Sequence, residues 1–553
     1  MHTDQQAMPA PDDPALYYLR NFHTALNWVG ERYADLLNAE ELAFLADFQR
    51  CEQAAQALLV RMVMRKGEHF RASKLQYAEI GDPIAAARSL LERGWLSDQA
   101  ALDAEAISAL LRKDELLDLL PAAQGRRRLK KPELQALLCE AEPAARCFAD
   151  WCPDLPEQVL SLTIQGLCDR LRLLFFGNLA QDWSEFVLAE LGIYRYESVA
   201  ISPESRAFRQ REDLQGYLHL YQLRESFAAG AELPPLLTTL DAFASDNPYL
   251  LTRHARLRLQ IAQHLEQQGD LAAALSLYQG CAQAEASWRR VRILEKTREF
   301  AAAHALAVQL STASTDAELL QRLYRALPRL TRQLGLPPAQ RTPPVVEARI
   351  DLQLPMPAQH SVEFAVREHF QQADAPVYYV ENTLLCSLFG LLCWPAIFAP
   401  LPGAFFHPFQ SGPADLHSGE FKERRAEIFA ACFAALDDGS YPAIMRRHFA
   451  DKYGLQSPFV YWELLDETLL ELALLCIPAA HLKVCFERLL DDIRANRAGM
   501  PDLIQFYPQQ RRYRMIEVKG PGDRLQDNQK RWLAFCALHG LPVEVCYVQW
   551  STA

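Results

Sequence analysis

The decisive stretch of this chain runs from Gly499 to Trp550 and is GMPDLIQFYPQQRRYRMIEVKGPGDRLQDNQKRWLAFCALHGLPVEVCYVQW. Two apolar runs flank a polar turn at 508–512, which predicts two strands joined as a hairpin. The GPGD segment then breaks the chain, and a helix-like segment that ends at Gly540 leads to a last β-rich run. The order strand–strand–helix–strand predicts an α/β domain in the C-terminal part of the chain.

Three charged residues have defined places in this hairpin. Asp502 opens the first strand, and Glu517 and Lys519 are two positions apart on the second, so both of their side chains point to one face. Charged groups on an apolar strand are costly to bury unless something binds them. Two carboxylates with a backbone carbonyl form an oxygen site suited to Mg²⁺ or Mn²⁺, and the lysine can orient a water molecule or offset phosphate charge. A surface ion pair of Glu517 with Lys519 is the alternative.

Length and composition limit the class of protein. The 553 residues are enough for three to four domains, and 69 acidic against 57 basic residues give a net charge of -12. This charge excludes a uniformly basic DNA-coating protein, so any DNA-binding surface must concentrate its positive charge locally. Thirteen cysteines without a C-x-x-C pair, and an acidic N-terminus without an apolar segment, predict a cytoplasmic protein. The sequence has no G-x-x-x-x-G-K-[ST] motif, so ATP is not expected as a cofactor.

The first 335 residues are predicted to be mainly helical, in three parts. Residues 1–115 favour a helix-turn-helix or winged-helix arrangement, with a plain helical bundle as the alternative. The stretch 107–140 contains two short amphipathic helices around a basic loop, 126–131, which is typical of a SAP-like DNA-binding module, expected at 116–160; a solvated charged loop is the alternative. Within 161–335, QGDLAAALSLY at 268–278 is echoed by TREFAAAHALA at 297–307, which predicts hairpin repeats similar to tetratricopeptide repeats.

The chain changes character after this helical part. Six prolines between Leu334 and Pro357 predict a linker at 336–357, followed by a C-terminal domain at 358–553. In that domain, residues 382–414 contain no charged side chain and imitate a membrane span. Prolines cut this run to about a dozen uninterrupted residues, short of the ~20 that a spanning helix needs. We therefore expect a buried core helix and no membrane contact.

The motifs resemble those of a known family. The spacing P-D-x(14)-E-x-K is the signature of the PD-(D/E)xK nuclease superfamily, and residues 435–553 resemble its VRR-NUC domain through GMPDLI and IEVKGPGDRLQDNQKRWL. VENTLLCSLFGLLCWPAIF at 380–398 resembles the segment before this domain in the Fanconi-associated nucleases. YYLRNF, RMVMRKGEHFRASKLQYAEI and the basic loop are similar to the N-terminal half of that family. The resemblance covers nearly the whole chain.

This resemblance implies both an architecture and an activity. The expected fold is mainly α: a winged-helix and SAP-like DNA-binding region, TPR-like helical repeats and a C-terminal PD-(D/E)xK domain. The expected enzyme is a structure-specific DNA phosphodiesterase, dependent on Mg²⁺ or Mn²⁺, that cuts near 5′ flaps and branched junctions. It also degrades DNA 5′→3′ and serves interstrand-crosslink repair. The chain resembles prokaryotic members, so we expect no ubiquitin-binding zinc finger, a single copy on DNA, and association with the nucleoid during repair.

The resemblance also assigns roles to residues of the C-terminal domain. The metal would be bound by the carboxylates of Glu381, Asp502 and Glu517 and by the carbonyl of Val518. Lys519 would be the catalytic lysine. Glu381 precedes the charge-free run, and a helix-terminal acid facing solvent is the alternative for it.

The resemblance also assigns roles to Gln529, on the helix after the lysine strand, and to Arg494. Gln529 matches a glutamine of the family and is expected to support the catalytic group. Arg494 matches a basic residue that contacts the terminal phosphate of a DNA 5′ end. Another basic position of the family is Asn528 in this chain, and this departure puts the detail of the phosphate pocket in doubt.

DNA affinity is expected to come from phosphate contacts, without a base-specific code, and substrate choice from DNA shape. The candidate residues are Arg65, Lys66, Arg71, Lys74, Arg126, Arg127, Arg128, Lys130, Lys131 and Arg494. Two alternatives remain for the function as a whole. The protein could be a resolvase of four-way junctions, or a helical-repeat repair scaffold that lacks catalysis.

Overall fold

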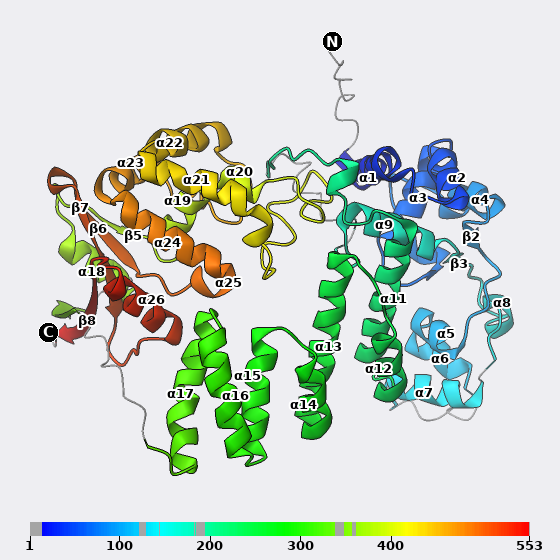
Figure 1. Cartoon of the computed structure of the whole chain (residues 1–553). Helices are drawn as coiled ribbons and strands as arrows, with labels where there is room; N and C mark the ends of the chain where they lie inside the picture. Colours follow the sequence, from blue (N-terminus) through cyan, green and yellow to red (C-terminus); the bar gives the residue numbers. More distant parts are fainter. Residues whose placement is uncertain are drawn as a thin grey trace. The chain divides into compact units, whose positions relative to one another are not determined.

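A computed structural model describes residues 14–120, 129–142, 144–181, 183, 194–337, 348–356 and 361–551 (Figure 1). The chain divides into two compact units. The N-terminal unit comprises residues 1–194 and 208–214, and the C-terminal unit comprises 195–207 and 215–553. The described residues are mainly helical, with an α/β domain last in the chain, as the sequence predicts.

The N-terminal unit combines helices with a small antiparallel sheet. Its sheet has the order β1-β3-β2, so the last strand in sequence lies in the middle. The helices α1, α2 and α3 pack together around buried aromatic rings such as Phe22 and Phe48. The elements are α1 Tyr17–Tyr33, α2 Ala39–Phe48, α3 Gln53–Val63, β1 His69–Arg71, α4 Pro83–Glu92, β2 Leu96–Ser97, α5 Ala104–Leu110, α6 Lys113–Asp118, α7 Lys131–Ala141, α8 Phe148–Trp151, β3 Val159–Leu162 and α9 Gln165–Phe176.

The SAP-like helices form a module inserted into this unit, with boundaries that differ from the predicted 116–160. Its core begins at Leu102 and joins Ile107 and Leu111 to Leu134 and Leu138, because α5 packs against α7. The chain then returns to the first sheet through β3, whose residues pair with both β1 and β2. Residues 159–162 therefore belong with the winged-helix sheet, since only their backbone closes it.

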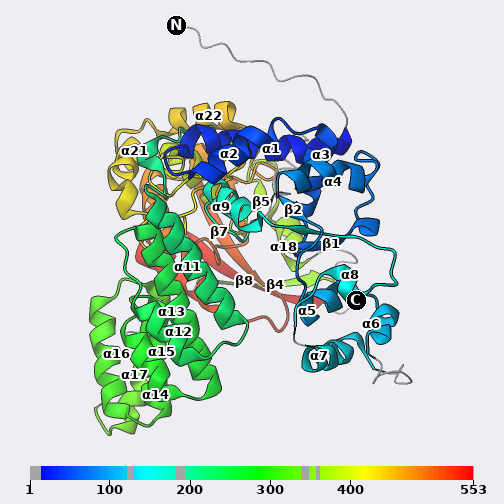
Figure 2. The ribbon, with the colours of Figure 1, turned by 90° about the vertical axis from the view of Figure 1, so that its right-hand side faces the viewer.

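The C-terminal unit begins with antiparallel helices. Consecutive helices from α13 to α17 pack side by side (Figure 1, Figure 2). Gly269 and Arg298 take left-handed backbone conformations at two hairpin turns, 29 residues apart. The two echoed segments therefore mark the same structural position in successive hairpins. The elements are α11 Arg211–Ala228, α12 Leu233–Asp241, α13 Pro248–Gln268, α14 Leu271–Gln279, α15 Ala284–Lys296, α16 Phe300–Ala313 and α17 Ala317–Gln333.

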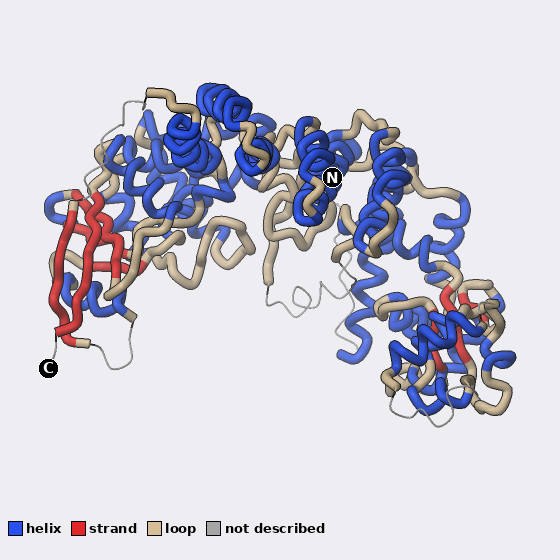
Figure 3. Tube along the Cα trace, turned by 90° about the horizontal axis from the view of Figure 1, so that it is seen from below, coloured by secondary structure: helices blue, strands red, loops and turns tan. Residues whose placement is uncertain are grey.

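The α/β domain contains one five-stranded sheet of order β4-β8-β7-β6-β5 (Figure 3). Strands β4, β8 and β7 run parallel, and β6 is antiparallel to β7 and β5. The predicted order of strand, strand, helix and strand corresponds to β6, β7, α26 and β8. The elements are β4 Arg349–Pro355, α18 Val362–Phe370, β5 Val377–Tyr379, α19 Leu384–Leu392, α20 Trp394–Ile397, α21 Ala426–Asp438, α22 Tyr441–Lys452, α23 Glu467–Cys476, α24 Ala479–Asp491, α25 Ile493–Asn496, β6 Leu503–Tyr507, β7 Arg512–Lys519, α26 Asp527–Leu538 and β8 Val543–Ser551.

Strand β4 corrects the predicted linker at 336–357. Residues 349–355 pair in parallel with β8 over seven positions. The apolar residues Ile350, Leu352 and Leu354 alternate with polar ones, which is the strand pattern. The prolines in the same stretch obscured this signal, and residues 338–347 lie outside the described part of the chain.

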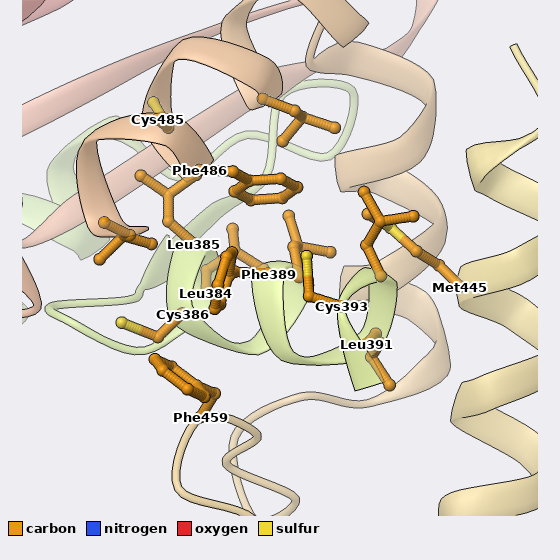
Figure 4. Close-up of a cluster of buried hydrophobic side chains, with 14 of the residues drawn as sticks. Leu384, Leu385, Cys386, Phe389, Leu391, Cys393, Met445, Phe459, Cys485 and Phe486 are labelled. Atoms are coloured by element: carbon orange, nitrogen blue, oxygen red, sulfur yellow. The ribbon is translucent and has the colours of Figure 1, made fainter. Parts of the chain in front are cut away.

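The charge-free run forms the core of the α/β domain. Every residue of α19 is buried. Phe389 lies among Phe459, Phe486 and other apolar side chains (Figure 4). This burial agrees with the predicted core helix. Among the described residues no single helix is long and apolar enough to cross a membrane, although α23 and α24 pass that test together as a pair bent by 109°.

Gly499 allows a close approach that fixes α26 beside the start of β6. Its φ is +88°, and a Cβ at this position would lie 2.7 Å from the backbone carbon of Asn528. A backbone atom cannot move aside as a flexible side chain can. Gly522 has the same φ, but a Cβ added there would have nothing within 4 Å. Substitution of Gly522 by Ala therefore measures the free-energy cost of the left-handed conformation alone.

We therefore predict that Gly499→Ala destabilises the protein more than Gly522→Ala. Both changes pay about 1–2 kcal/mol for the left-handed conformation, and Gly499→Ala adds about 1–3 kcal/mol of overpacking. Urea denaturation of the two variants and of wild type, followed by far-UV circular dichroism, measures the difference. Equal losses in the two variants would contradict the close approach.

Candidate active site

Three acidic residues gather at one end of the sheet, where β5 ends, β6 begins and β7 ends. Strands β6 and β7 pair Leu503 with Ile516, so the same register places Asp502 opposite Glu517. The backbone N–H of Val380 donates to the carbonyl of Asp502 at 2.8 Å. This bond brings the end of β5, and with it Glu381, to the same place.

The side chains of the predicted catalytic set are buried. The exposed fractions of Asp502, Glu517 and Lys519 are 6%, 1% and 7%. The backbone N–H of Val518 donates to Asp502 Oδ2 at 2.7 Å, and Lys519 Nζ lies 2.7 Å from Glu517 Oε1. Glu517 Oε2 is buried without a hydrogen-bond partner among the described residues. Glu517 and Lys519 thus form a buried ion pair, and not the surface ion pair that was the alternative for them.

Burial and like charge dominate the electrostatics of this set. Desolvation raises the pKa of Glu517, and the charge of Asp502 adds to the effect despite the opposing Lys519. Desolvation likewise raises the pKa of Asp502, against the hydrogen bond from Val518 and with the charge of Glu381. Two carboxylates that repel each other in a buried position favour a cation between them.

Glu381 lies in the turn between β5 and α19 and is held by two neighbours. Tyr379 Oη donates to Glu381 Oε2 at 2.5 Å, and Asn382 Nδ2 donates to Glu381 Oε1 at 3.1 Å. Burial and the hydrogen bond to Glu381 raise the pKa of Tyr379, so its phenol remains a donor. Asn382 has φ +55° and accepts a hydrogen bond from the N–H of Met500. Glu381 is therefore tied to the chain that enters β6, which disfavours the alternative of a free helix-terminal acid.

The donor set fits a hard divalent cation. Carboxylate oxygens are the ligands that Mg²⁺ and Mn²⁺ prefer, and the buried, unpartnered Oε2 of Glu517 lacks a positive neighbour of its own. No group of three or more His, Cys, Asp or Glu side chains is already arranged to hold a metal ion among the described residues. The three acids would therefore have to draw closer together for all of them to share one ion.

The structure places Gln529 at the start of α26 rather than against the acids. Its Oε1 accepts from the N–H of Gln526 at 2.8 Å, which closes a capping box. This bond gives Gln529 a structural task at the helix end. The neighbouring Asp527 is paired with Arg325 of α17. No described contact joins Gln529 to Asp502, Glu517 or Lys519.

Arg494 is exposed on α25 and belongs to a positive cluster that sequence reasoning did not find. The pKa of His417 is lowered, first by burial and then by the positive charges of Arg497, Arg494 and Arg256. The loop that carries His417 is braced at Asp415, which pairs with the buried Arg425. These residues come from segments far apart in the sequence, so spacing gave no signal of the cluster.

The candidate DNA-binding residues of the N-terminal unit have different surroundings. Arg65, Lys66 and Lys74 are exposed, and so is Lys130; Lys131 is half-buried. Residues 126–128 lie outside the described part of the chain, so Arg126, Arg127 and Arg128 are not placed.

Arg71 requires a correction. Its guanidinium pairs with Glu115 at 2.6 Å and with Glu157 at 2.9 Å, and its side chain is only 12% exposed. A phosphate would have to displace two buried carboxylates. Arg71 therefore joins the SAP-like module to the sheet, and we no longer expect it to contact DNA.

Comparison with known proteins gives matches along the chain. Three family models match: "FAN1, HTH domain" at residues 16–97, "Fanconi anemia-associated nuclease SAP domain" at 101–151 and "VRR-NUC domain" at 436–550. The Fanconi-associated nuclease 1 homolog of Pseudomonas aeruginosa is 55% identical, over 100% of this chain and 99% of that protein. The human Fanconi-associated nuclease 1 is 24% identical, over 96% of this chain and 62% of that protein.

Solved structures are also similar. The crystal structure of paFAN1 bound to 2nt 5′flap DNA with gap has a TM-score of 0.86 at 54% identity, covering 98% of this chain and 100% of that one. The complex with 1nt 5′flap DNA has a TM-score of 0.85 at the same identity and coverage.

The repelling carboxylates predict a stability that depends on pH and on metal. A carboxyl group with a raised pKa contributes stability at low pH that is lost as the pH rises through the raised value. In EDTA, wild type should therefore lose roughly 1–3 kcal/mol relative to Asp502→Asn as the pH rises from about 4, where ordinary carboxyls titrate. Mg²⁺ should restore wild type increasingly with pH and leave Asp502→Asn unchanged.

Thermal unfolding at a series of pH values, with EDTA or with Mg²⁺, measures both effects. Asp351→Asn serves as a control, because Asp351 is an exposed acid on β4 of the same sheet. A wild-type curve parallel to that of Asp502→Asn in both buffers would exclude the repulsion.

Proposed function

The chain belongs to the Fanconi-associated nuclease family, and on this basis we propose that it hydrolyses DNA phosphodiester bonds near 5′ flaps and branched junctions. Membership makes the protein a DNA nuclease with a C-terminal VRR-NUC domain. The observation that supports this substrate is that both solved structures of paFAN1 contain 5′-flap DNA, and this chain is 54% identical to paFAN1 over nearly its full length. The intact Asp502, Glu517 and Lys519 argue against a scaffold that has lost catalysis.

The residues of the site have separate tasks in this reaction. Glu381, Asp502, Glu517 and the carbonyl of Val518 would hold Mg²⁺ or Mn²⁺, which supplies charge neutralisation at the phosphate and a more acidic water. Lys519 is held at the same end of the sheet by Glu517. From there its ammonium can orient a water for attack on phosphorus and offset the negative charge that develops as the P–O bond breaks.

The three arginines around His417, namely Arg494, Arg497 and Arg256, support a role in holding a DNA end. A terminal phosphate carries more charge than a backbone phosphate, and positive side chains would be needed to hold it. Asn528 contributes no charge at the position where the family has a basic residue, and Arg256 on α13 and Arg494 on α25 would supply positive charge instead. We propose that these arginines receive the 5′ end or the flap strand.

Further parts of the function rest on the family and the sequence. We propose 5′→3′ exonuclease activity and a role in interstrand-crosslink repair, with one copy of the chain on each DNA and without ATP. All thirteen cysteines are unpaired, which supports a reducing cytoplasm as the place of action, at the nucleoid during repair.

We predict that wild type cleaves a 5′-flap duplex in Mg²⁺ or Mn²⁺ but not in EDTA. Asp502→Ala should lose activity by a factor of at least ~10², because removal of the acid weakens the metal site, while DNA binding persists. Asp351→Ala, on the same sheet, should keep normal rates. Gel analysis of flap, splayed-arm and four-way substrates follows the products.

The outcomes separate the possible functions. Faster cleavage of the four-way junction than of the flap would favour a resolvase. Binding without cleavage in either metal would contradict the nuclease and favour a structural repair factor.

We also predict that DNA affinity falls steeply with salt, because phosphate contacts release counterions. Lys66→Ala and Lys74→Ala should each weaken binding to all sequences alike and lower the slope of log K against log salt by about 1. Lys483→Ala is the control, since Asp437 already holds that ammonium. Fluorescence anisotropy at a series of salt concentrations gives the slopes, and an affinity that does not change with salt would overturn this electrostatic account.

A further inference from the structure

The geometry points to Tyr379 as a positioning residue for the metal site, acting through Glu381 together with Asn382. We propose that its phenol fixes the carboxylate of Glu381 in the orientation that lets it share a cation with Asp502 and Glu517. The inference rests on the proposed metal-dependent nuclease function and adds to it a group that does not itself touch the metal or DNA.

Glu381 differs from the other two acids in how it is held. Asp502 and Glu517 extend the paired register of β6 and β7 and are buried, so the sheet fixes their direction. Glu381 lies two residues after the end of β5 and is only half-buried. A glutamate outside regular structure has several rotamers, and most of them would carry its oxygens away from the site.

Two hydrogen bonds select one of these orientations. Tyr379 Oη and Asn382 Nδ2 donate to different oxygens of Glu381, at 2.5 and 3.1 Å. Because each oxygen receives one donor, the plane of the carboxylate is set. Each oxygen still has a lone pair free in principle for a cation.

Asn382 connects this arrangement to the strand that carries Asp502. Its Oδ1 accepts from the N–H of Met500 at 3.1 Å, two residues before Asp502. Its φ of +55° is a conformation that asparagine tolerates better than most residues. Glu381 is therefore held relative to Asp502 and not only to its own turn.

The ring of Tyr379 makes little packing contribution that would account for a tyrosine at this position. It is 46% exposed, although it lies in a strand. The adjacent Tyr378 points to the other face, is half-buried and packs against the ring of Phe506. Loss of the hydroxyl group at 379 should thus change the position of Glu381 and leave the core intact.

The test compares Tyr379→Phe with Tyr378→Phe in the full-length protein without DNA. Mn²⁺ binding is titrated by electron paramagnetic resonance, which counts free ions directly. Loss of a partner that orients a ligand weakens metal binding by about 10–100-fold. We expect a loss in this range for Tyr379→Phe, near wild-type binding for Tyr378→Phe, and unchanged melting temperatures in EDTA for both. Binding by Tyr379→Phe within about twofold of wild type would overturn the proposal.

Cleavage kinetics provide a readout that a general structural defect would not give. In Tyr379→Phe the Mn²⁺ concentration for half-maximal cleavage should rise about tenfold or more, while the rate at saturating Mn²⁺ stays near wild type. A lower rate at every metal concentration with unchanged Mn²⁺ binding would contradict a positioning role. Asn382→Gly, which permits the same backbone conformation without the amide, should act in the same direction if Tyr379→Phe folds poorly.

The Mn²⁺-binding measurement distinguishes a failure of this inference from a failure of the proposed function. Wild type that binds Mn²⁺ but cleaves no DNA would remove the nuclease function, and the comparison of variants would still decide the role of Tyr379. Wild type that binds no Mn²⁺ would overturn both. Cleavage by wild type with identical Mn²⁺ binding in Tyr379→Phe would overturn the inference alone.

Discussion

The repulsion between Asp502 and Glu517 is the constraint around which the α/β domain is built. Their carboxylates belong to paired strands, lie opposite each other and are shielded from water. Burial raises the pKa of both groups, and the charge of Asp502 raises that of Glu517 further. One lysine and one backbone N–H offset part of this cost. The remaining imbalance is what a divalent cation bound between the two carboxylates would remove.

The rest of the domain holds these two acids in place. Parallel pairing with β8 fixes the end of the lysine strand β7. The apolar helix α19 belongs to the core cluster that also contains Met515, which lies on the same face of β7 as Glu517 and Lys519. Gly499 lets α26 approach the start of β6. Glu381 enters from a third strand and is oriented by side-chain hydrogen bonds rather than by the sheet. The orientation of Glu381 thus depends on the side chains of Tyr379 and Asn382, whereas the positions of Asp502 and Glu517 depend on backbone pairing.

The predictable parts of this protein are those with local signals. The two apolar runs around a polar turn predicted the hairpin, and the two-residue spacing of Glu517 and Lys519 predicted that they share a face. Strand β4 was missed because prolines masked the alternation of Ile350, Leu352 and Leu354. The role of Arg71 could not be inferred, because its partners Glu115 and Glu157 are 44 and 86 residues away. The same holds for the cluster at His417, which depends on the tertiary structure.

Crystals of the full-length chain grown with Mn²⁺ would test the central claim most directly, through the anomalous signal of the metal. The account predicts one strong peak within bonding distance of carboxylate oxygens from Asp502, Glu517 and Glu381 and of the carbonyl oxygen of Val518. It further predicts that Glu381 keeps its hydrogen bonds to Tyr379 and Asn382. A peak at another place, or an ion bound without Asp502 and Glu517, would contradict the claim that their repulsion creates the site.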